Sequence, residues 1–513
     1  MSFTLTERRS GLLLHLSSLP GPYFVGGLGT EADLFAAGLA RAGQSWWQML
    51  PVNPIGDGNS PYATISSFAG EPLYIDLQGL ARRGWLKHSE IAAPPGGAGR
   101  RVNYRAARQF KLARLRTALD RAMQDPALRR KLSAFRERER GWLRDYALFA
   151  ALTARYATAT WTNWPVPLRD RTPAALKAAE RELAGELTYH ELTQLIFADQ
   201  WRAFKMRAHQ LGVGLIGDLP IFVAHGSADV WAHRRYFRLD SAGRLTVQAG
   251  CPPDAFTPEG QCWGNALYDW QALAQDDFGW WTARLARATA LFDAIRLDHF
   301  IGFRRYWEID ARARTAQGGH WRQAPGDAFF AAVTKKLGRP ALIAEDLGAV
   351  TPAVRALRDK FGFPGMKVLQ FAFDGTAEAA QHLPHRLPER AVVYTGTHDN
   401  NTTRGWYGDL ERRARRDPVA RSELGRVLAY LGTSSRTVHT DLMRAAMLSP
   451  ASVTIFPVQD LLGLGTSARM NVPGVARGNW RYRLAPGEPH AAAWDSLLAM
   501  TQVSGRALGR PGQ

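Results

Sequence analysis

A segment near the middle of the chain joins an apolar run to two charged residues that could do chemistry. Residues 291–295 are mostly apolar, which predicts a buried parallel strand, and Arg296 and Asp298 follow at its end. Two positions apart, they share one face of a strand. Burying both charges without partners is costly, so they fit best where a strand opens into a cleft. Asp298 is either an ionised nucleophile or half of a structural ion pair, and this segment alone does not decide.

Acidic residues also stand at the ends of three other predicted strands. The full set is Asp218, Asp298, Glu345 and Asp399. Four carboxylates at one edge of a sheet would repel each other unless cations or a ligand offset them, and Arg296 and His398 are the available partners. Paired carboxylates without a metal suit glycosidic bond cleavage, in which one carboxylate is the nucleophile and one carboxyl is the acid.

The expected spacing of Asp298 and Glu345 agrees with that chemistry. A retaining enzyme holds its two carboxyl groups about 5–5.5 Å apart, and neighbouring strands lie about 4.8 Å apart. Glu345 is followed by Asp346, and strand alternation turns only one of the two inward. We take Glu345 as the inward acid.

Short apolar strands that alternate with helical stretches would position these residues. Eight strands are expected, at residues 11–16, 45–51, 212–223, 294–300, 340–346, 367–373, 391–397 and 452–458. Eight βα units with polar residues at the carboxyl ends of the strands are typical of a barrel whose active site lies at that end. The sequence therefore predicts an α/β fold, a (β/α)8 TIM barrel with inserted mainly helical subdomains.

One long stretch interrupts the alternation of strands and helices. Residues 106–154 have helical periodicity and few strand signals. We expect three parts: the barrel start at 1–79, an inserted helical subdomain at 80–187, and the rest of the barrel at 188–513. Residues 248–263, rich in proline and glycine, are expected to form a lid loop. Residues 504–513 lack an apolar pattern, which predicts a frayed end.

The composition limits the class of protein. The 513 residues are 46% hydrophobic and carry a formal net charge of +19, which raises a polyanion hypothesis. No nucleic-acid-binding signature accompanies the charge, so no nucleic-acid partner is expected. No His or Cys spacing predicts a metal, and no glycine-rich strand–helix motif predicts a dinucleotide, so no cofactor is expected. Two cysteines and the lack of a signal or membrane-length segment predict a cytoplasmic protein without membrane attachment.

Nearly the whole chain resembles the 4-α-glucanotransferases of the amylomaltase type (disproportionating enzymes, glycoside hydrolase family 77), relatives of the α-amylases. The matching motifs include Gly11-Leu-Leu-Leu-His-Leu-Ser-Ser-Leu-Pro20, Ser60-Pro-Tyr62, Gly217-Asp-Leu-Pro-Ile-Phe-Val223, Gly260-Gln-Cys-Trp-Gly-Asn265, Arg296-Leu-Asp-His-Phe300, Ala344-Glu-Asp-Leu-Gly348, Gly396-Thr-His-Asp-Asn400 and Gly478-Asn-Trp480. This many ordered matches do not arise by chance. The resemblance supports the barrel and the choice of Glu345.

The resemblance also implies a role for each candidate residue. Asp298 matches the nucleophile, Glu345 the general acid and base, and Asp399 the third carboxylate, which holds sugar hydroxyls. It implies substrate-binding roles for Tyr62, Asp218, Gln261, Trp263, Arg296 and His398. It further implies maltooligosaccharides and α-1,4-glucans such as starch, glycogen or maltodextrin as substrates, glucose or maltose as acceptors, no cofactor or metal, and a monomer or weak homo-oligomer.

Three other functions compete with a transferase. A hydrolase of the same chemistry would use water as its acceptor. An inactive glucan-binding protein would need missing carboxylates, and this sequence keeps all four. A polyanion-binding protein would use the positive net charge and would bind in a salt-sensitive way.

Overall fold

Eight parallel strands form a closed barrel in the computed structural model, which describes residues 3–253 and 257–507. Around the barrel the order is β1-β13-β12-β11-β10-β7-β3-β2, so the first strand pairs with the last. The strands are β1 Arg9–Leu13, β2 Trp46–Gln48, β3 Gly214–Leu219, β7 Ala294–Leu297, β10 Leu342–Ala344, β11 Gly365–Val368, β12 Ala391–Tyr394 and β13 Val453–Pro457. Most of their residues are buried, as expected for strands covered on both faces. The predicted (β/α)8 barrel is confirmed.

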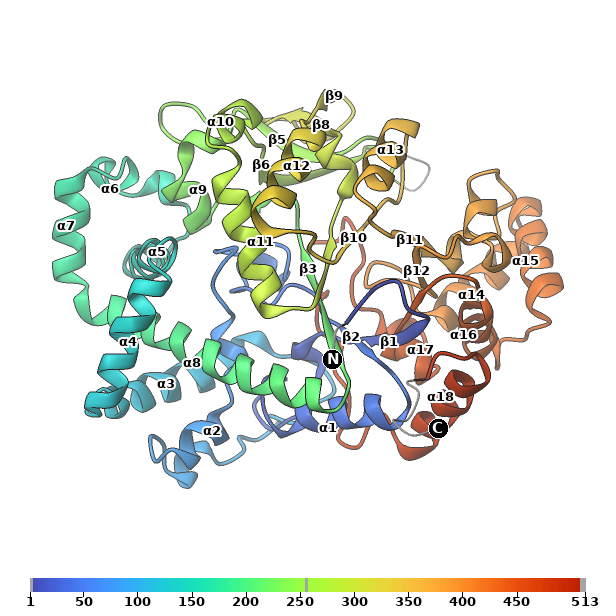
Figure 1. The fold of residues 1–513 in the computed structure, drawn as a ribbon, viewed down its shortest axis with the longest axis horizontal. Coiled ribbons are helices and arrows are strands. Elements are labelled where there is room, and N and C mark those ends of the chain that lie inside the picture. Colours follow the sequence, from blue (N-terminus) through green and yellow to red (C-terminus); the bar gives the residue numbers. More distant parts are fainter. Residues whose placement is uncertain (1–2, 254–256, 508–513) are drawn as a thin grey trace.

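Helices surround the barrel and connect most successive strands (Figure 1). The connecting helices are α1 Thr30–Arg41, α8 Ala184–Gln210, α9 Ala228–Ala232, α10 Trp270–Gln275, α11 Gly279–Leu291, α12 Gly326–Leu337, α13 Pro352–Lys360, α14 Thr403–Ala414, α15 Pro418–Leu431 and α16 Val438–Leu448, with α17 Val458–Leu461 and α18 Ala491–Val503 after β13. Between β11 and β12 the described chain forms only three 3-10 turns, at Leu369–Phe371, Ala379–His382 and Pro384–Arg386. That connection therefore departs from the expected βα pattern.

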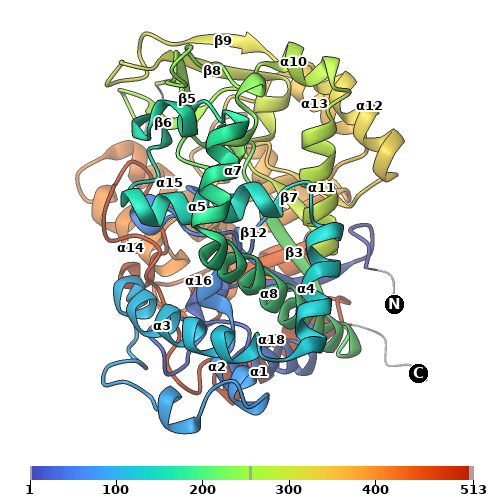
Figure 2. The ribbon, with the colours of Figure 1, turned by 90° about the vertical axis from the view of Figure 1, so that its left-hand side faces the viewer.

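A mainly helical segment lies between β2 and β3 and covers one side of the molecule (Figure 2). Its helices before α8 are α2 Leu77–Arg82, α3 Tyr104–Ala122, α4 Pro126–Arg138, α5 Leu143–Tyr156, α6 Val166–Arg169 and α7 Pro173–Glu182. Helix α8 spans 27 residues and runs through the expected boundary at 187. Its buried face includes Trp201 and Phe204, which pack against Phe292 and Trp47. The division into three parts remains a prediction.

A second, five-stranded sheet has the order β4-β6-β5-β8-β9 and lies at the top of Figure 1. Its strands are β4 Val223–Ala224, β5 Val247–Cys251, β6 Gln261–Ala266, β8 Arg305–Asp310 and β9 His320–Gln323. Residues 248–263, expected to be a loop, therefore lie mostly in the antiparallel strands β5 and β6 or between them, and residues 254–256 lie outside the described residues. We call these two strands the β5–β6 hairpin.

Arg506, after α18, forms hydrogen bonds with the backbone where β1 pairs with β13, a junction called here the β1–β13 seam. The guanidinium of Arg506, fully buried, donates hydrogen bonds of 2.7–3.1 Å to the backbone oxygens of five residues. These are Arg9, Met447, Ser449, Ala451 and Ser452. The expectation of a frayed end at 504–513 is therefore wrong for residues 504–507, because one arginine side chain anchors them without any apolar periodicity. Residues 508–513 lie outside the described residues.

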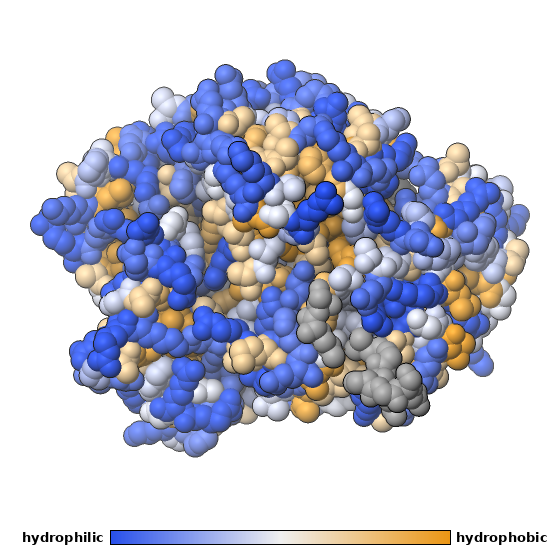
Figure 3. Space-filling model, in the orientation of Figure 1, coloured by the Kyte–Doolittle hydropathy of each residue, from blue (hydrophilic) through white to orange (hydrophobic). Residues whose placement is uncertain are grey.

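The surface agrees with a chain that carries many charged residues. Hydrophilic residues cover most of the face seen in Figure 3, and apolar residues appear there in small groups. Among the described residues, no helix combines the length and the hydropathy needed to cross a membrane.

Candidate active site

A buried arginine joins two of the predicted carboxylates at the ends of β3 and β7. Asp218 and Arg296 are register partners on these strands. Arg296 Nη1 lies 2.7 and 2.8 Å from the two Asp218 carboxylate oxygens and 2.9 Å from Asp298 Oδ1. Burial opposes the charge of Arg296, yet the two carboxylates hold its pKa well above the usual value. The shared face inferred for Arg296 and Asp298 thus becomes a bridge between two acids.

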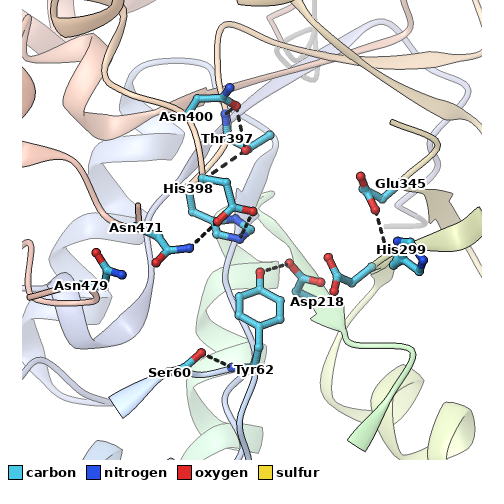
Figure 4. A network of polar contacts seen from close by, with 12 residues as sticks. Ser60, Tyr62, Asp218, His299, Glu345, Thr397, His398, Asn400, Asn471 and Asn479 are labelled. Atoms are coloured by element: carbon cyan, nitrogen blue, oxygen red, sulfur yellow. Dashed lines mark hydrogen bonds and ion pairs between the residues drawn. The ribbon is translucent and has the colours of Figure 1, made fainter. Parts of the chain in front are cut away.

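Tyr62 reaches this group from the loop after β2. Its hydroxyl donates a hydrogen bond of 2.8 Å to Asp218 Oδ2, and its ring stacks on His398, with centroids 5.1 Å apart and planes 19° apart. Trp480 packs against both rings. Figure 4 shows Tyr62 and Asp218 between His398 on one side and the His299–Glu345 pair on the other. Tyr62 therefore offers an aromatic ring whose polar end is fixed to the charged cluster.

Asp399 lies on the loop after β12 and has two polar partners. His398 Nε2 is 3.3 Å from Asp399 Oδ2, and Asn471 Nδ2 donates a hydrogen bond of 2.6 Å to Oδ1. Burial alone would raise the pKa of Asp399, but the His398 ring and these hydrogen bonds hold it well below the usual value. The side chain remains 44% exposed. Asp399 is therefore an ionised group that a ligand can reach.

Glu345 stands directly beside Asp298 in the order of the barrel. Leu297 and Ala344 are register partners on β7 and β10, so Asp298 and Glu345 follow matched positions. The backbone N–H of His299 donates a hydrogen bond of 2.6 Å to Glu345 Oε2. Burial raises the pKa of Glu345 well above its usual value; Arg296 opposes that rise and Asp298 adds to it. Glu345 is thus suited to carry a proton.

Asp346 faces a different environment from Glu345. Its carboxylate accepts a hydrogen bond of 2.8 Å from the backbone N–H of Met366 and pairs with Arg358 of α13. Its side chain is only 2% exposed. Asp346 therefore has a structural role between β10, β11 and α13, and Glu345 is the acid of this pair that borders Asp298.

The β5–β6 hairpin brings Gln261 and Trp263 toward the same place. The Trp263 ring meets His299 edge to face, with centroids 5.0 Å apart, and its Nε1 donates to Gln261 Oε1 at 3.1 Å. Trp263 is 37% exposed, which is high for so large an apolar residue. Trp263 thus borders His299, the residue that links Asp298 to Glu345, and Gln261 is hydrogen-bonded to Trp263.

The arrangement supports one kind of chemistry in particular. An ion-paired carboxylate and a carboxyl with a raised pKa lie side by side, next to an exposed aromatic ring. Retaining glycosidic bond cleavage requires such a pair, one ionised carboxylate as the nucleophile and one protonated carboxyl as the acid. Within the described ranges, no group of three or more His, Cys, Asp and Glu side chains is arranged to hold a metal ion.

Comparison with known proteins identifies the family. A family model described as 4-alpha-glucanotransferase matches residues 14–488. The chain belongs to the 4-alpha-glucanotransferase family. Its relatives include the 4-alpha-glucanotransferases of Thermus thermophilus, 47% identical over 97% of this chain and 99% of that protein, and of Synechocystis sp., 42% identical over 98% of this chain and 99% of that protein. The resemblance inferred from the motifs is confirmed.

A solved structure in this glucanotransferase family has the same fold. The amylomaltase from Streptococcus agalactiae, solved in complex with acarbose, superimposes with a TM-score of 0.93 at 32% sequence identity, over 98% of this chain and all of that one. The agreement over the whole chain includes the barrel and its connections. A retaining transferase is therefore the enzyme class of this chain.

Two residues of this glucanotransferase site carried no functional assignment in the sequence. Asn471 donates to Asp399 Oδ1 and its backbone N–H bonds to the His398 oxygen. Trp480 stood in a quoted motif without a role. Asn471 follows no strand end and belongs to no charged pattern, so only its position beside Asp399 reveals it.

Proposed function

We propose that this glucanotransferase moves segments of α-1,4-glucan between sugar chains by a double-displacement reaction that retains the anomeric configuration. The observation that carries the proposal is the pair formed by Asp298 and Glu345, which follow matched positions on adjacent strands. Asp298 is ion-paired with Arg296, whereas burial favours a protonated Glu345. The two carboxyl groups therefore differ in the way that nucleophile and acid must differ.

The two steps balance through these residues. Asp298 attacks the anomeric carbon while Glu345 delivers its proton to the glycosidic oxygen, so that the reducing-end piece leaves and a covalent glucosyl-enzyme forms. Glu345, now ionised, removes the proton of an acceptor 4-hydroxyl. That oxygen attacks the anomeric carbon and displaces Asp298, which returns both residues to their starting states.

The remaining candidates would hold the reacting sugar. Arg296 spans Asp218 and Asp298, so it would fix the nucleophile and limit its mobility. Asp399, ionised and accessible, would accept hydrogen bonds from sugar hydroxyls. The Tyr62 ring would stack against the sugar face, and His398, which stacks on Tyr62 and contacts Asp399, would hold both in place.

The hairpin residues would favour transfer over hydrolysis. Trp263 borders the Glu345 side of the site through its contact with His299, and Gln261 is hydrogen-bonded to Trp263. There they would exclude water and align the acceptor.

The proposed substrates are maltooligosaccharides and longer α-1,4-glucans such as starch, glycogen or maltodextrin, with glucose or maltose as acceptors. An exposed aromatic ring and accessible polar groups support a sugar ligand. We place the reaction in the cytoplasm and infer a monomer or weak homo-oligomer. All the residues of the proposed site belong to one chain, so the site does not require a second copy.

Incubation with maltotriose tests the function. We expect glucose together with a ladder of longer maltooligosaccharides, separated and read by chromatography. Glucose and maltose without longer products would show hydrolysis instead. An Asp298→Asn variant serves as the control for contaminating glucosidases. An unreactive wild-type protein that still binds glucan would contradict catalysis and favour the glucan-binding alternative.

The pH dependence of the rate tests the role of Glu345. The first step needs protonated Glu345, so the rate should fall as pH rises through the raised pKa of this residue. Because that pKa lies well above the usual glutamate value, activity should persist at pH values where an ordinary glutamate is ionised. A Glu345→Gln variant should be roughly 10²–10⁴-fold slower and lose this alkaline limb.

The exposed Glu378→Gln variant is the matched control and should keep the wild-type profile. If the alkaline fall of the rate is the same in Glu345→Gln as in the wild type, the titrating group is another residue and Glu345 is not the acid.

A further inference from the structure

His299 occupies an unusual position between the nucleophile and the hairpin. It follows Asp298 directly and has φ 51° and ψ 51°, the left-handed region that non-glycine residues seldom adopt. Its Nε2 atom is buried without a hydrogen-bond partner in the described part of the chain. Burial lowers the pKa of the imidazole to about 4, so the ring is neutral near pH 7. A neutral, strained and unsatisfied histidine next to a catalytic acid calls for a physical reason.

The backbone of His299 supplies the first part of that reason. In the left-handed conformation its N–H points at Glu345 Oε2, at 2.6 Å. An oxygen that accepts this N–H cannot also direct a proton along the same line. The proton of the acid is therefore carried by the other oxygen, Oε1, which leaves it available to the glycosidic oxygen. The conformation of His299 thus selects the oxygen that does the chemistry.

The ring of His299 supplies the second part. It meets the Trp263 ring at 88° and 5.0 Å, and Phe222 at 6.4 Å. The ring also lies close to Gly302, where an added Cβ atom would come within 3.1 Å of its Cδ2 atom, so a larger residue at 302 would crowd the ring. Any displacement of Trp263 would therefore be passed to the His299 ring, and the short main-chain link would pass it to the N–H that holds Glu345.

We propose that His299 is a positioning residue that couples Trp263 of the β5–β6 hairpin to the orientation of Glu345. This inference rests on the proposed role of Glu345 as acid and base. The edge-to-face contact of Trp263 with His299 and the hydrogen bond from the His299 N–H to Glu345 would connect the acceptor side of the site to proton delivery. A substrate that shifts Trp263 would thereby align the acid.

The charges around Glu345 make the coupling measurable. The groups that act on its titration are Arg296 and Asp298 of the β7 end and the adjacent Asp346. Trp263 carries no charge, so its replacement removes no electrostatic partner of Glu345. The His299 N–H favours the ionised form, since it donates to a carboxylate oxygen. Loosening that bond should therefore move the alkaline limb of the rate to higher pH.

A double-mutant cycle tests the proposal. The variants are Trp263→Leu, His299→Asn and the pair together; asparagine tolerates the left-handed conformation and keeps the N–H but lacks the ring. We expect each single variant to lower kcat about tenfold and to move the alkaline limb upward by about half a pH unit. The double variant should resemble either single one. Trp321→Leu, on strand β9 at the far edge of the same sheet, should leave the limb in place.

Each outcome of the cycle is decisive. Three results would overturn the coupling. They are additive shifts in the double variant, an alkaline limb that moves in only one of the single variants, and a limb that moves in neither. Thermal unfolding checks that His299→Asn folds; if it does not, His299→Gly, which also allows the positive φ, takes its place. The pH profile of Glu345→Gln separates the proposed function from the proposed coupling. If Glu345→Gln loses the alkaline limb while Trp263→Leu and His299→Asn leave it unmoved, the function stands and only the coupling is wrong.

Discussion

Replacing Asp298 by asparagine should abolish transfer while the fold stays intact. Asparagine has nearly the same shape but cannot form the covalent glucosyl-enzyme, so we expect kcat to fall by at least about 10⁴-fold, as for other nucleophiles that act as part of a unit. Arg296 Nη1 keeps its hydrogen bonds to both Asp218 oxygens in the variant, which limits the structural cost. The measurement is the rate of glucose release from maltotriose, together with the circular dichroism spectrum.

The control for Asp298 is Asp495→Asn on α18, where the side chain is 71% exposed. That variant should retain wild-type turnover. An Asp298→Asn protein that keeps a tenth or more of the wild-type rate would rule out the covalent role. The same rate measurement on Glu345→Gln would then show whether the other carboxyl alone carries the reaction.

Replacing Arg506 by methionine should give the largest loss of stability. Methionine fills similar space but removes all five hydrogen bonds that Arg506 donates at the β1–β13 seam. The oxygens of Met447 and Ser449 keep a bond from Arg8, and that of Ser452 keeps one from the Arg9 N–H, so the oxygens of Arg9 and Ala451 are affected most. Each buried acceptor left unsatisfied costs about 1–3 kcal/mol, partly regained by relaxation and water. We therefore expect a loss of about 3 kcal/mol or more in the free energy of unfolding, read from the shift of the urea midpoint.

Burial lowers the pKa of Arg506 to about 9, so its charge is present near pH 7 and every donor is in use. Arg477→Met, at an exposed position, is the matched control and should leave the midpoint in place. A loss below about 1 kcal/mol for Arg506→Met would mean that the seam is held by strand pairing and apolar packing alone.

Much of the barrel could be predicted because its strands are apolar runs that end in acids. The signal was strongest where Arg296 and Asp298 share a face, and the structure keeps them 2.9 Å apart. A single sequence does not contain strand register, so the bridge from Arg296 to Asp218 on another strand was not predictable in detail. The resemblance supplied the choice between Glu345 and Asp346, which periodicity alone left open.

Other parts could not be predicted for identifiable physical reasons. Residues 367–373 are mostly apolar, which predicts a strand, but β11 ends at Val368 and a 3-10 turn follows at Leu369–Phe371. An apolar run fits a buried turn at the barrel mouth as well as a strand. The prolines and glycines of residues 248–263 predict irregular backbone, so they hide the β5–β6 hairpin. Asn471 depends on a contact between segments 72 positions apart in the chain.

The seam at Arg506 also has a consequence for how the chain reaches its fold. Arg506 Nη1 bonds to the Arg9 oxygen across 497 positions. One edge of β1 pairs with β13, which is the last barrel strand in the sequence. During synthesis, β1 therefore exists for a long time as an open strand edge, which is a template for wrong pairing. Contacts this distant along the sequence also slow folding. Moving the chain ends into an exposed surface loop by circular permutation would make this seam local, and we expect faster refolding with the same final barrel.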